Sequence, residues 1–77
     1  MKPYRDQSGH SGISHYETGK DFIEIKFKTD KSSVYIYNHQ LNGKIHIDNM
    51  KKLADHGQGL STYISQHPEV RDHFVKK

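Results

Sequence analysis

Residues 22–28 read Phe-Ile-Glu-Ile-Lys-Phe-Lys, and residues 34–37, a short distance further on, read Val-Tyr-Ile-Tyr. In the first run apolar and charged side chains alternate, which is the period-2 pattern of a half-buried strand. The second run is β-branched and aromatic, and the polar residues 29–33 between the two runs favour a turn. Together the two runs predict a β-hairpin with one apolar face and one charged face.

The composition indicates one small domain. The chain has 77 residues, of which 31% are hydrophobic, so nearly every large apolar side chain is needed in the core. The expected core residues are Ile23, Ile25, Phe27, Val34, Ile36, Leu41, Ile45, Ile47, Met50, Leu53, Leu60, Ile64, Val70 and Phe74. Cysteine is absent, which excludes disulfides and thiolate metal sites. No apolar run approaches the ~20 residues of a membrane span, and residues 1–6 lack the apolar stretch of a secretory signal, so we expect a cytoplasmic protein.

The segment before the hairpin predicts an arm and one more strand. Residues 1–12 end in a small, polar, glycine-rich stretch that is typical of a disordered N-terminal arm, which leaves residues 13–77 as the single domain. Residues 13–16 predict a short strand with Ile13 and His15 on one face and Tyr16 on the other. Residues 17–21 predict a turn, and residues 38–43, after the hairpin, predict a loop.

The second half of the chain predicts helices. Four apolar residues share one helical face: Ile47, Met50, Leu53 and Ala54. Asp48 is expected near the start of this helix and Gly57 at its end. Further short helices are expected to start at Ser61 and Pro68. The predicted fold class is α+β: a small antiparallel sheet, made of the β-hairpin and a short N-terminal strand, with two or three short helices on one face.

Residues 13–74 resemble the KTSC domain, a family named for the C-termini of lysyl-tRNA synthetases and also found as small stand-alone bacterial proteins. The resemblance rests on residues 13–16, the apolar alternation of residues 23–27, the central Tyr35-Ile36-Tyr37, the helix that ends at residues 53–54, and residues 57–64. The chain departs from the family in a longer expected hairpin turn and in lacking the serine of an Ala-x-Ser-x-Gly motif. The function of the family is unknown, and the resemblance implies RNA binding as a suggestion.

The orientation of Tyr35 and Tyr37 separates two interpretations. Both tyrosines share one face of their strand, but the sequence leaves the hairpin register open. In one register they lie beside Lys26 and Lys28 and form a stacking platform for single-stranded bases. In the other register they pack under the helices, and Ile36 faces outward. The resemblance favours the second register, because the middle residue of the family's motif is commonly polar.

No catalytic, metal or cofactor site is predicted, and the chain is not expected to be an enzyme. The seven histidines lack the spacings of metal ligands on a helix or a strand. Glu69 and His73, four residues apart, predict a weak surface pair on the last helix. The net charge of +3 is spread over mixed charges, so it is only a weak indication of an anionic partner.

Two functions from different classes remain open. The first is an accessory RNA-binding module; its expected contact residues are Lys26, Lys28, Tyr35, Tyr37, Asn38, Lys76 and Lys77. The second is a protein-interaction or structural module, which uses a sheet edge or an apolar groove to recruit a partner or to form a weak homodimer. The resemblance favours RNA binding slightly, whereas the residues alone do not distinguish the two.

Overall fold

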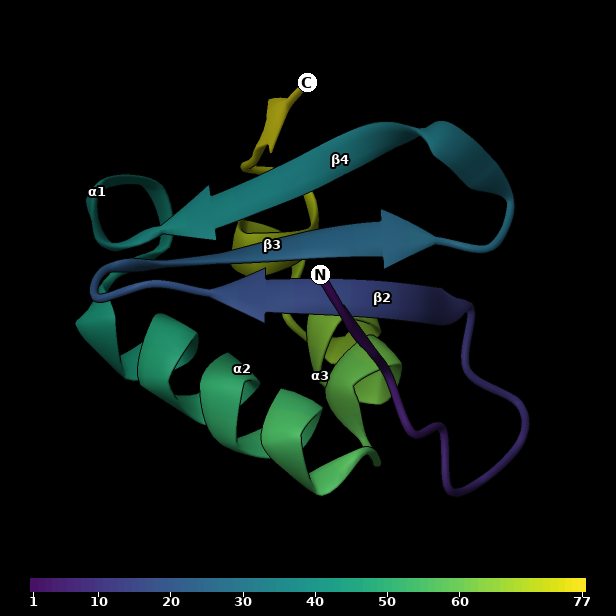
Figure 1. Cartoon of the computed structure of the whole chain (residues 1–77). Coiled ribbons are helices and arrows are strands. Elements are labelled where there is room, and N and C mark those ends of the chain that lie inside the picture. Colours follow the sequence, from purple (N-terminus) through teal and green to yellow (C-terminus); the bar gives the residue numbers. More distant parts are fainter.

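The computed structural model describes all 77 residues as an α+β domain with one five-stranded antiparallel sheet. The strands are β1 (Lys2–Pro3), β2 (Ile13–Thr18), β3 (Phe22–Phe27), β4 (Asp30–Asn38) and β5 (Val75–Lys76), and their order in the sheet is the order in the sequence. The hairpin between β3 and β4 is confirmed. Its turn is shorter than expected, because β4 already begins at Asp30. Figure 1 shows β2, β3 and β4 side by side, with the short β5 against the middle of β4.

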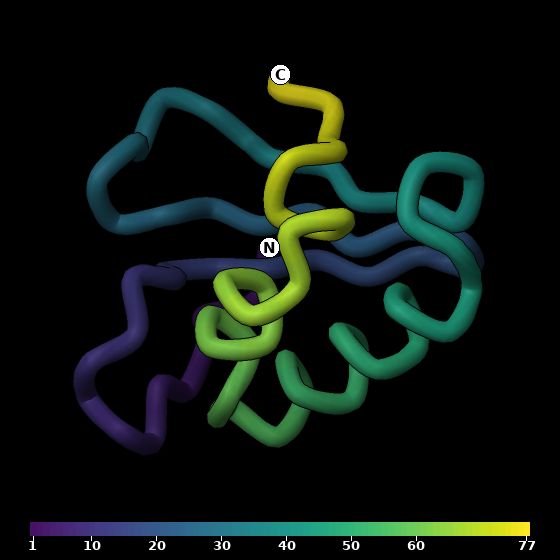
Figure 2. The backbone as a smooth tube through the Cα atoms, turned by 180° about the vertical axis from the view of Figure 1, so that it is seen from behind, coloured from purple at the N-terminus to yellow at the C-terminus, as the bar shows by residue number.

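Four helices follow β4 before the chain returns to the sheet. They are α1 (His39–Asn42), α2 (Lys44–His56), α3 (Leu60–Gln66) and α4 (Pro68–Arg71). The view from behind in Figure 2 shows the helical segments in front of the strands, so the helices cover one face of the sheet. The other face of the sheet carries no helix. None of the helices has the length and apolar character needed to cross a membrane.

The helix boundaries follow from capping chemistry. Gly57 ends α2 with a φ of 77°, and its N–H donates to the carbonyl oxygens of Leu53 and Ala54, as the sequence predicts. Pro68 begins α4, where its missing N–H leaves no intrahelical bond unmade. Asp48 does not start α2, because this helix begins one turn earlier and Asp48 pairs with Lys44 instead. The expected loop after β4 contains the single turn of α1.

The core lies between the helix-covered face of the sheet and the helices. Its buried apolar residues are Tyr4, Ile13, Tyr16, Ile23, Ile25, Tyr37, Ile47, Met50, Ala54, Leu60, Ile64 and Val70. Ile45 is 77% exposed, Leu41 42% and Phe74 36%, so the placement of these three residues in the core was wrong. Ile36 lies opposite Glu24, on the face of the sheet without helices, and so it was also wrongly placed in the core.

A β-bulge explains how β2 buries two residues that strict alternation would separate. Ile13 lies opposite Phe27 and His15 lies opposite Lys26, so β2 contains one residue more than β3 in this interval. The extra residue brings Ile13 and Tyr16 onto the same, core-facing side, where both are buried. The expected grouping of Ile13 with His15 was therefore wrong.

The N-terminal segment, which its composition predicts to be a disordered arm, packs against the domain in the structure. Lys2 and Pro3 pair with β2, and Tyr4 is only 6% exposed. The Gln7 N–H donates to the carbonyl oxygen of Gly57 (2.8 Å), and the Lys28 N–H donates to that of Gly12 (2.7 Å). These contacts join the segment to both the helical half and the hairpin.

Candidate functional site

The register of the hairpin places Tyr35 and Tyr37 on the core face. Tyr37 lies opposite Ile23 and Tyr35 opposite Ile25, and directly opposed residues of an antiparallel pair share a face. Tyr37 is 2% exposed, and its burial raises the pKa of its hydroxyl to about 12. Tyr35 is half-buried. The stacking platform beside the lysines is therefore not formed, and the second of the two registers is the observed one.

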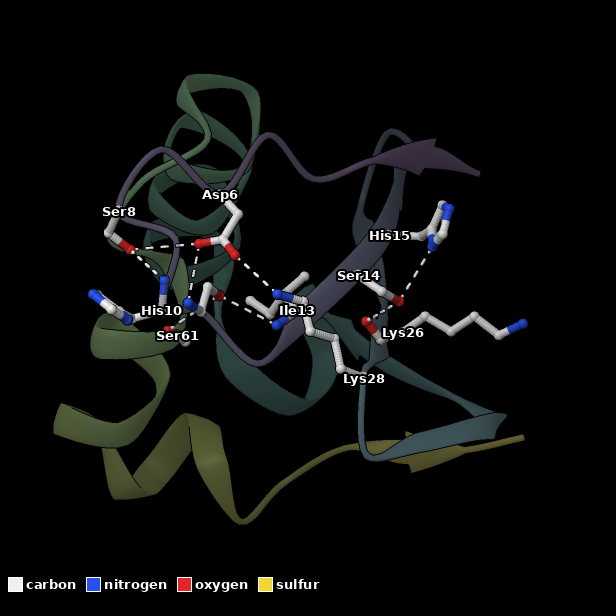
Figure 3. A network of polar contacts seen from close by, with 10 residues as sticks. Asp6, Ser8, His10, Ile13, Ser14, His15, Lys26, Lys28 and Ser61 are labelled. Atoms are coloured by element: carbon white, nitrogen blue, oxygen red, sulfur yellow. Dashed lines mark hydrogen bonds and ion pairs between the residues drawn. The ribbon is translucent and has the colours of Figure 1, made fainter.

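The two hairpin lysines point in different directions. Lys26 lies opposite His15 on the face of the sheet without helices. Lys28 turns toward the N-terminal segment, where its Nζ lies 2.9 Å from Oδ2 of Asp6. Figure 3 shows this difference: Lys28 approaches Asp6, while Lys26 extends away from the network.

Asp6 organises the N-terminal segment through both carboxylate oxygens. Oδ2 accepts from Lys28, and Oδ1 accepts from the N–H of Ser11 (3.0 Å). These contacts, the bond to Lys28 first, hold the pKa of Asp6 below its ordinary value. The hydroxyl of Ser11 lies 3.4 Å from that of Ser61 on α3, which connects the network to the helices (Figure 3). Lys28 thus has a structural partner within the chain.

The other predicted contact residues, Asn38, Lys76 and Lys77, make separate contacts within the chain. Oδ1 of Asn38 accepts from the Leu41 N–H (2.8 Å) and so caps the first turn of α1. The backbone of Lys77 exchanges two hydrogen bonds with Val34. Lys76 lies on the core face opposite Tyr35. Of the seven predicted contact residues, the structure brings together Tyr35, Tyr37 and Lys76.

The structure contains one pocket, and both tyrosines line it. Its volume is about 270 Å³, and it lies between the turn end of the β3–β4 hairpin, α3, and the segment that follows α4. We call it the aromatic pocket; its lining residues are Phe27, Thr29, Asp30, Tyr35, Tyr37, Ser61, Ile64, Ser65, Arg71 and Phe74.

Aromatic rings form much of the wall of the pocket. The rings of Phe27 and Tyr35 are 5.0 Å apart and nearly perpendicular, at 86°. The Phe74 ring lies 4.9 Å from that of Tyr35 and 6.0 Å from that of Tyr37. These distances are within the range of attractive ring pairs. Phe74 remains 36% exposed.

The charged groups of the aromatic pocket are paired within the chain. Asp30 accepts from the hydroxyl of Tyr35 (3.0 Å) and lies 3.4 Å from the Nζ of Lys76. The Tyr35 hydroxyl, and then Lys76, hold the pKa of Asp30 below its ordinary value, although partial desolvation acts in the opposite direction. Arg71 donates to the carboxylate of Asp72 from Nε (3.0 Å) and from Nη2 (3.2 Å). The pocket therefore presents apolar surface without an excess of charge.

A second bulge shapes this part of the sheet. Tyr35 lies opposite Ile25 and Asp30 lies opposite Phe27, so β4 has three residues more than β3 over the same interval. β5 pairs with β4 only at Tyr35 and Ile36, next to the hydrogen bonds between Lys77 and Val34. Residues 30–33 extend past β5, and this length of β4 has no strand on its outer side.

The histidines are not arranged as metal ligands. No three side chains of His, Asp or Glu are close enough together to hold a metal ion. Nδ1 of His46 lies 2.6 Å from the hydroxyl of Tyr63, and its Nε2 lies 3.6 Å from Glu69, so these residues join α2, α3 and α4. Glu69 thus faces His46 rather than His73, whose ring contacts the Glu69 carbonyl oxygen.

The aromatic pocket is the feature that the sequence did not predict as a unit. Its residues come from β3, the hairpin turn, β4, α3, α4 and the segment before β5, and no local pattern connects these segments. The tyrosine pair was the available signal, and Phe74 was expected only as a core residue. Comparison of the chain with family models, curated proteins and solved structures gives no match.

Proposed function

We propose that this chain is a protein-recognition module that takes up an apolar side chain of a partner protein in the aromatic pocket. One observation supports this function best: the pocket is walled by Phe27, Tyr35 and Phe74, while its charged groups are paired within the chain. Exposed apolar surface in a concave site favours an apolar ligand, at roughly 25 cal/mol per Å² removed from water.

RNA binding is less favoured by the same geometry. A polyanion gains affinity from free cations, through the release of counterions from the phosphates. Lys28 and Lys76 are paired with carboxylates, and Lys26 lies on the opposite face of the sheet from the tyrosines. RNA binding is therefore the alternative outcome of the binding test that follows. The relation to the KTSC domain stays a prediction.

The test is a selection of binding peptides from a random display library on the immobilised protein. Ser65 is an exposed residue at the pocket, and Ser65→Trp places an indole there. Thr62→Trp is the matched control, because Thr62 is exposed on the same helix and does not line the pocket. Thermal unfolding of both variants checks that they keep the fold.

We expect selected peptides to bind the wild type and Thr62→Trp alike, and to bind Ser65→Trp at least about tenfold more weakly, a loss of about 1.4 kcal/mol. This binding should change little with salt concentration. A random RNA pool is tested in parallel at about 50 and about 200 mM salt. Retention of RNA that falls steeply with salt, without any pocket-dependent peptide, would overturn the proposal in favour of the nucleic-acid function.

A further inference from the structure

We propose that the group held in the aromatic pocket is the aromatic side chain of an extended peptide segment, whose backbone lies along residues 30–33 of β4. This inference rests on the proposed function and specifies the partner of the same site.

The pocket is smaller than those that enclose a whole drug-sized ligand, and a single side chain fits within it. Its volume of about 270 Å³ is just below the ~300–1,000 Å³ of pockets that enclose drug-sized ligands. The pocket is also open to solvent, so a side chain can enter while its backbone stays outside.

The wall chemistry favours a ring over an aliphatic group. Around Tyr35, the rings of Phe27 and Phe74 stand at 86° and 51°, so the wall already contains rings in edge-on and tilted arrangements. Aromatic pairs in such arrangements gain ≈ 0.5–1.5 kcal/mol beyond the burial of their area. An additional ring therefore finds partners here that an aliphatic side chain does not.

The charge balance of the pocket favours an uncharged occupant. Asp30 is engaged by Tyr35 and Lys76, and Arg71 is engaged by Asp72. A charged side chain would lose hydration on entering and would find no free charge of opposite sign. The same consideration disfavours a nucleobase, which brings two flanking phosphates toward these carboxylates.

The open length of β4 provides a site for the peptide backbone. Residues 30–33 extend past β5 and have no strand on their outer side. Exposed strand edges accept extended peptides through main-chain hydrogen bonds, while neighbouring pockets take alternate side chains. Asp30 belongs to this edge and also lines the pocket, so one segment can reach both.

The experiment uses blocked tripeptides, acetyl-Thr-X-Thr-amide, titrated into isotope-labelled full-length protein and followed by amide and methyl chemical shifts. X is Phe, Trp, Leu or Lys, and adenosine 3′,5′-bisphosphate, a base with a phosphate on each side of its ribose, serves as the nucleotide probe. We expect Phe and Trp to bind about 2- to 12-fold more tightly than Leu, and the Lys peptide and the nucleotide not to bind. The largest shifts are expected at Ile64 and Ser65 in the pocket and at Ser32 on the edge.

Two further arms test the parts of the inference separately. N-methylation of the threonine nitrogens of the Phe peptide removes backbone donors without touching the protein, and it should weaken binding and abolish the shift at Ser32. Ser65→Trp should abolish binding, whereas Thr62→Trp should not. Equal binding of Leu and Phe, binding of adenosine 3′,5′-bisphosphate in the pocket, or indifference to N-methylation would overturn the inference.

These outcomes are distinguishable from failure of the proposed function. Display-selected peptides that depend on the pocket but carry no aromatic residue would overturn the inference and leave protein recognition standing. If neither the library nor the tripeptides yield a ligand that depends on the pocket, both proposals are refuted.

Discussion

Replacement of Tyr4 by alanine tests whether the N-terminal segment is part of the folded domain. Tyr4 is 6% exposed, its ring meets that of Tyr16 edge-on at 6.4 Å, and its hydroxyl oxygen accepts from the Leu60 N–H at 3.4 Å. Removal of a buried aromatic side chain costs ~3–5 kcal/mol. A domain of this length has a total stability of about 4–12 kcal/mol, so Tyr4→Ala should remove a large part of it.

The assay is urea unfolding followed by circular dichroism. With a slope of ~1 kcal/mol per molar urea, we expect the midpoint of Tyr4→Ala to fall by about 3 M or more, and the melting temperature to fall by at least ~12 °C. Tyr4→Phe keeps the ring and loses only the acceptor for the long hydrogen bond from Leu60, so it should cost ~0.5–1.5 kcal/mol.

A Tyr4→Ala protein as stable as the wild type would show that the N-terminal segment is not packed into the domain. A residue in a disordered arm has no packing to lose, so both variants would then lie within ~0.5 kcal/mol of the wild type. Because Tyr4→Phe is expected to remain folded, the comparison stays measurable even where the alanine variant unfolds. Amide hydrogen exchange of Gln7 and Ser11 provides an independent measure of order in the same segment.

Three further predictions follow from the fold. Gly57→Ala should destabilise the domain by at least ~1 kcal/mol, since φ is 77° and a Cβ there would collide with the N-terminal segment; Gly12→Ala, which meets no atom within 4 Å, should be nearly neutral in the same urea assay. The Tyr37 hydroxyl should titrate near pH 12 when followed by the NMR chemical shifts of its own ring, and stability should fall as pH rises from about 10 toward 12, because ionisation is easier in the unfolded chain. Ile45→Lys should change the unfolding free energy by less than ~0.5 kcal/mol, whereas Ile47→Ala should cost ~2–5 kcal/mol.

Each of these has a contradicting result. Equal destabilisation by the two glycine replacements would show that neither the backbone angle nor the room for a Cβ atom makes Gly57 different from Gly12. A hydroxyl that titrates near its ordinary value would show that Tyr37 is accessible to water. Strong destabilisation by Ile45→Lys would show that the Ile45 side chain is buried in the core.

The parts of the fold that the sequence predicted are those controlled by local chemistry. Alternation over residues 22–28 predicted β3, Gly57 predicted the end of α2, and Pro68 predicted the start of α4. Each signal lies within a few residues of the feature it specifies, so the physical cause was visible in the sequence.

The features that the sequence did not predict depend on contacts between distant residues. The bulges in β2 and β4 change which side chains share a face, and no single residue type marks them. The N-terminal segment is polar in composition, but Tyr4 and Asp6 attach it to α3 and to the hairpin through contacts 22 or more residues apart in sequence. A polar composition therefore indicates disorder only for a segment that makes no such contacts with distant residues.

The candidate site shows the same division. The sequence pattern pointed to Tyr35 and Tyr37, and it indicated that the register of the hairpin decides which face they occupy. The period-2 pattern alone could not select the register, because both registers satisfy it; the resemblance to the KTSC domain favoured the observed one. The register alone does not predict the aromatic pocket, because its wall also needs the ring of Phe74. The position of Phe74 depends on how the segment after α4 returns to the sheet.

Occupation of the aromatic pocket can be measured by intermolecular NOEs between a bound aromatic tripeptide and the methyl groups of Ile64, which lies at the wall of the pocket. The proposal predicts NOEs from the peptide ring to this residue in the wild type and their loss in Ser65→Trp. NOEs from the ring to Ile36 on the opposite face of the sheet, with none to Ile64, would contradict it.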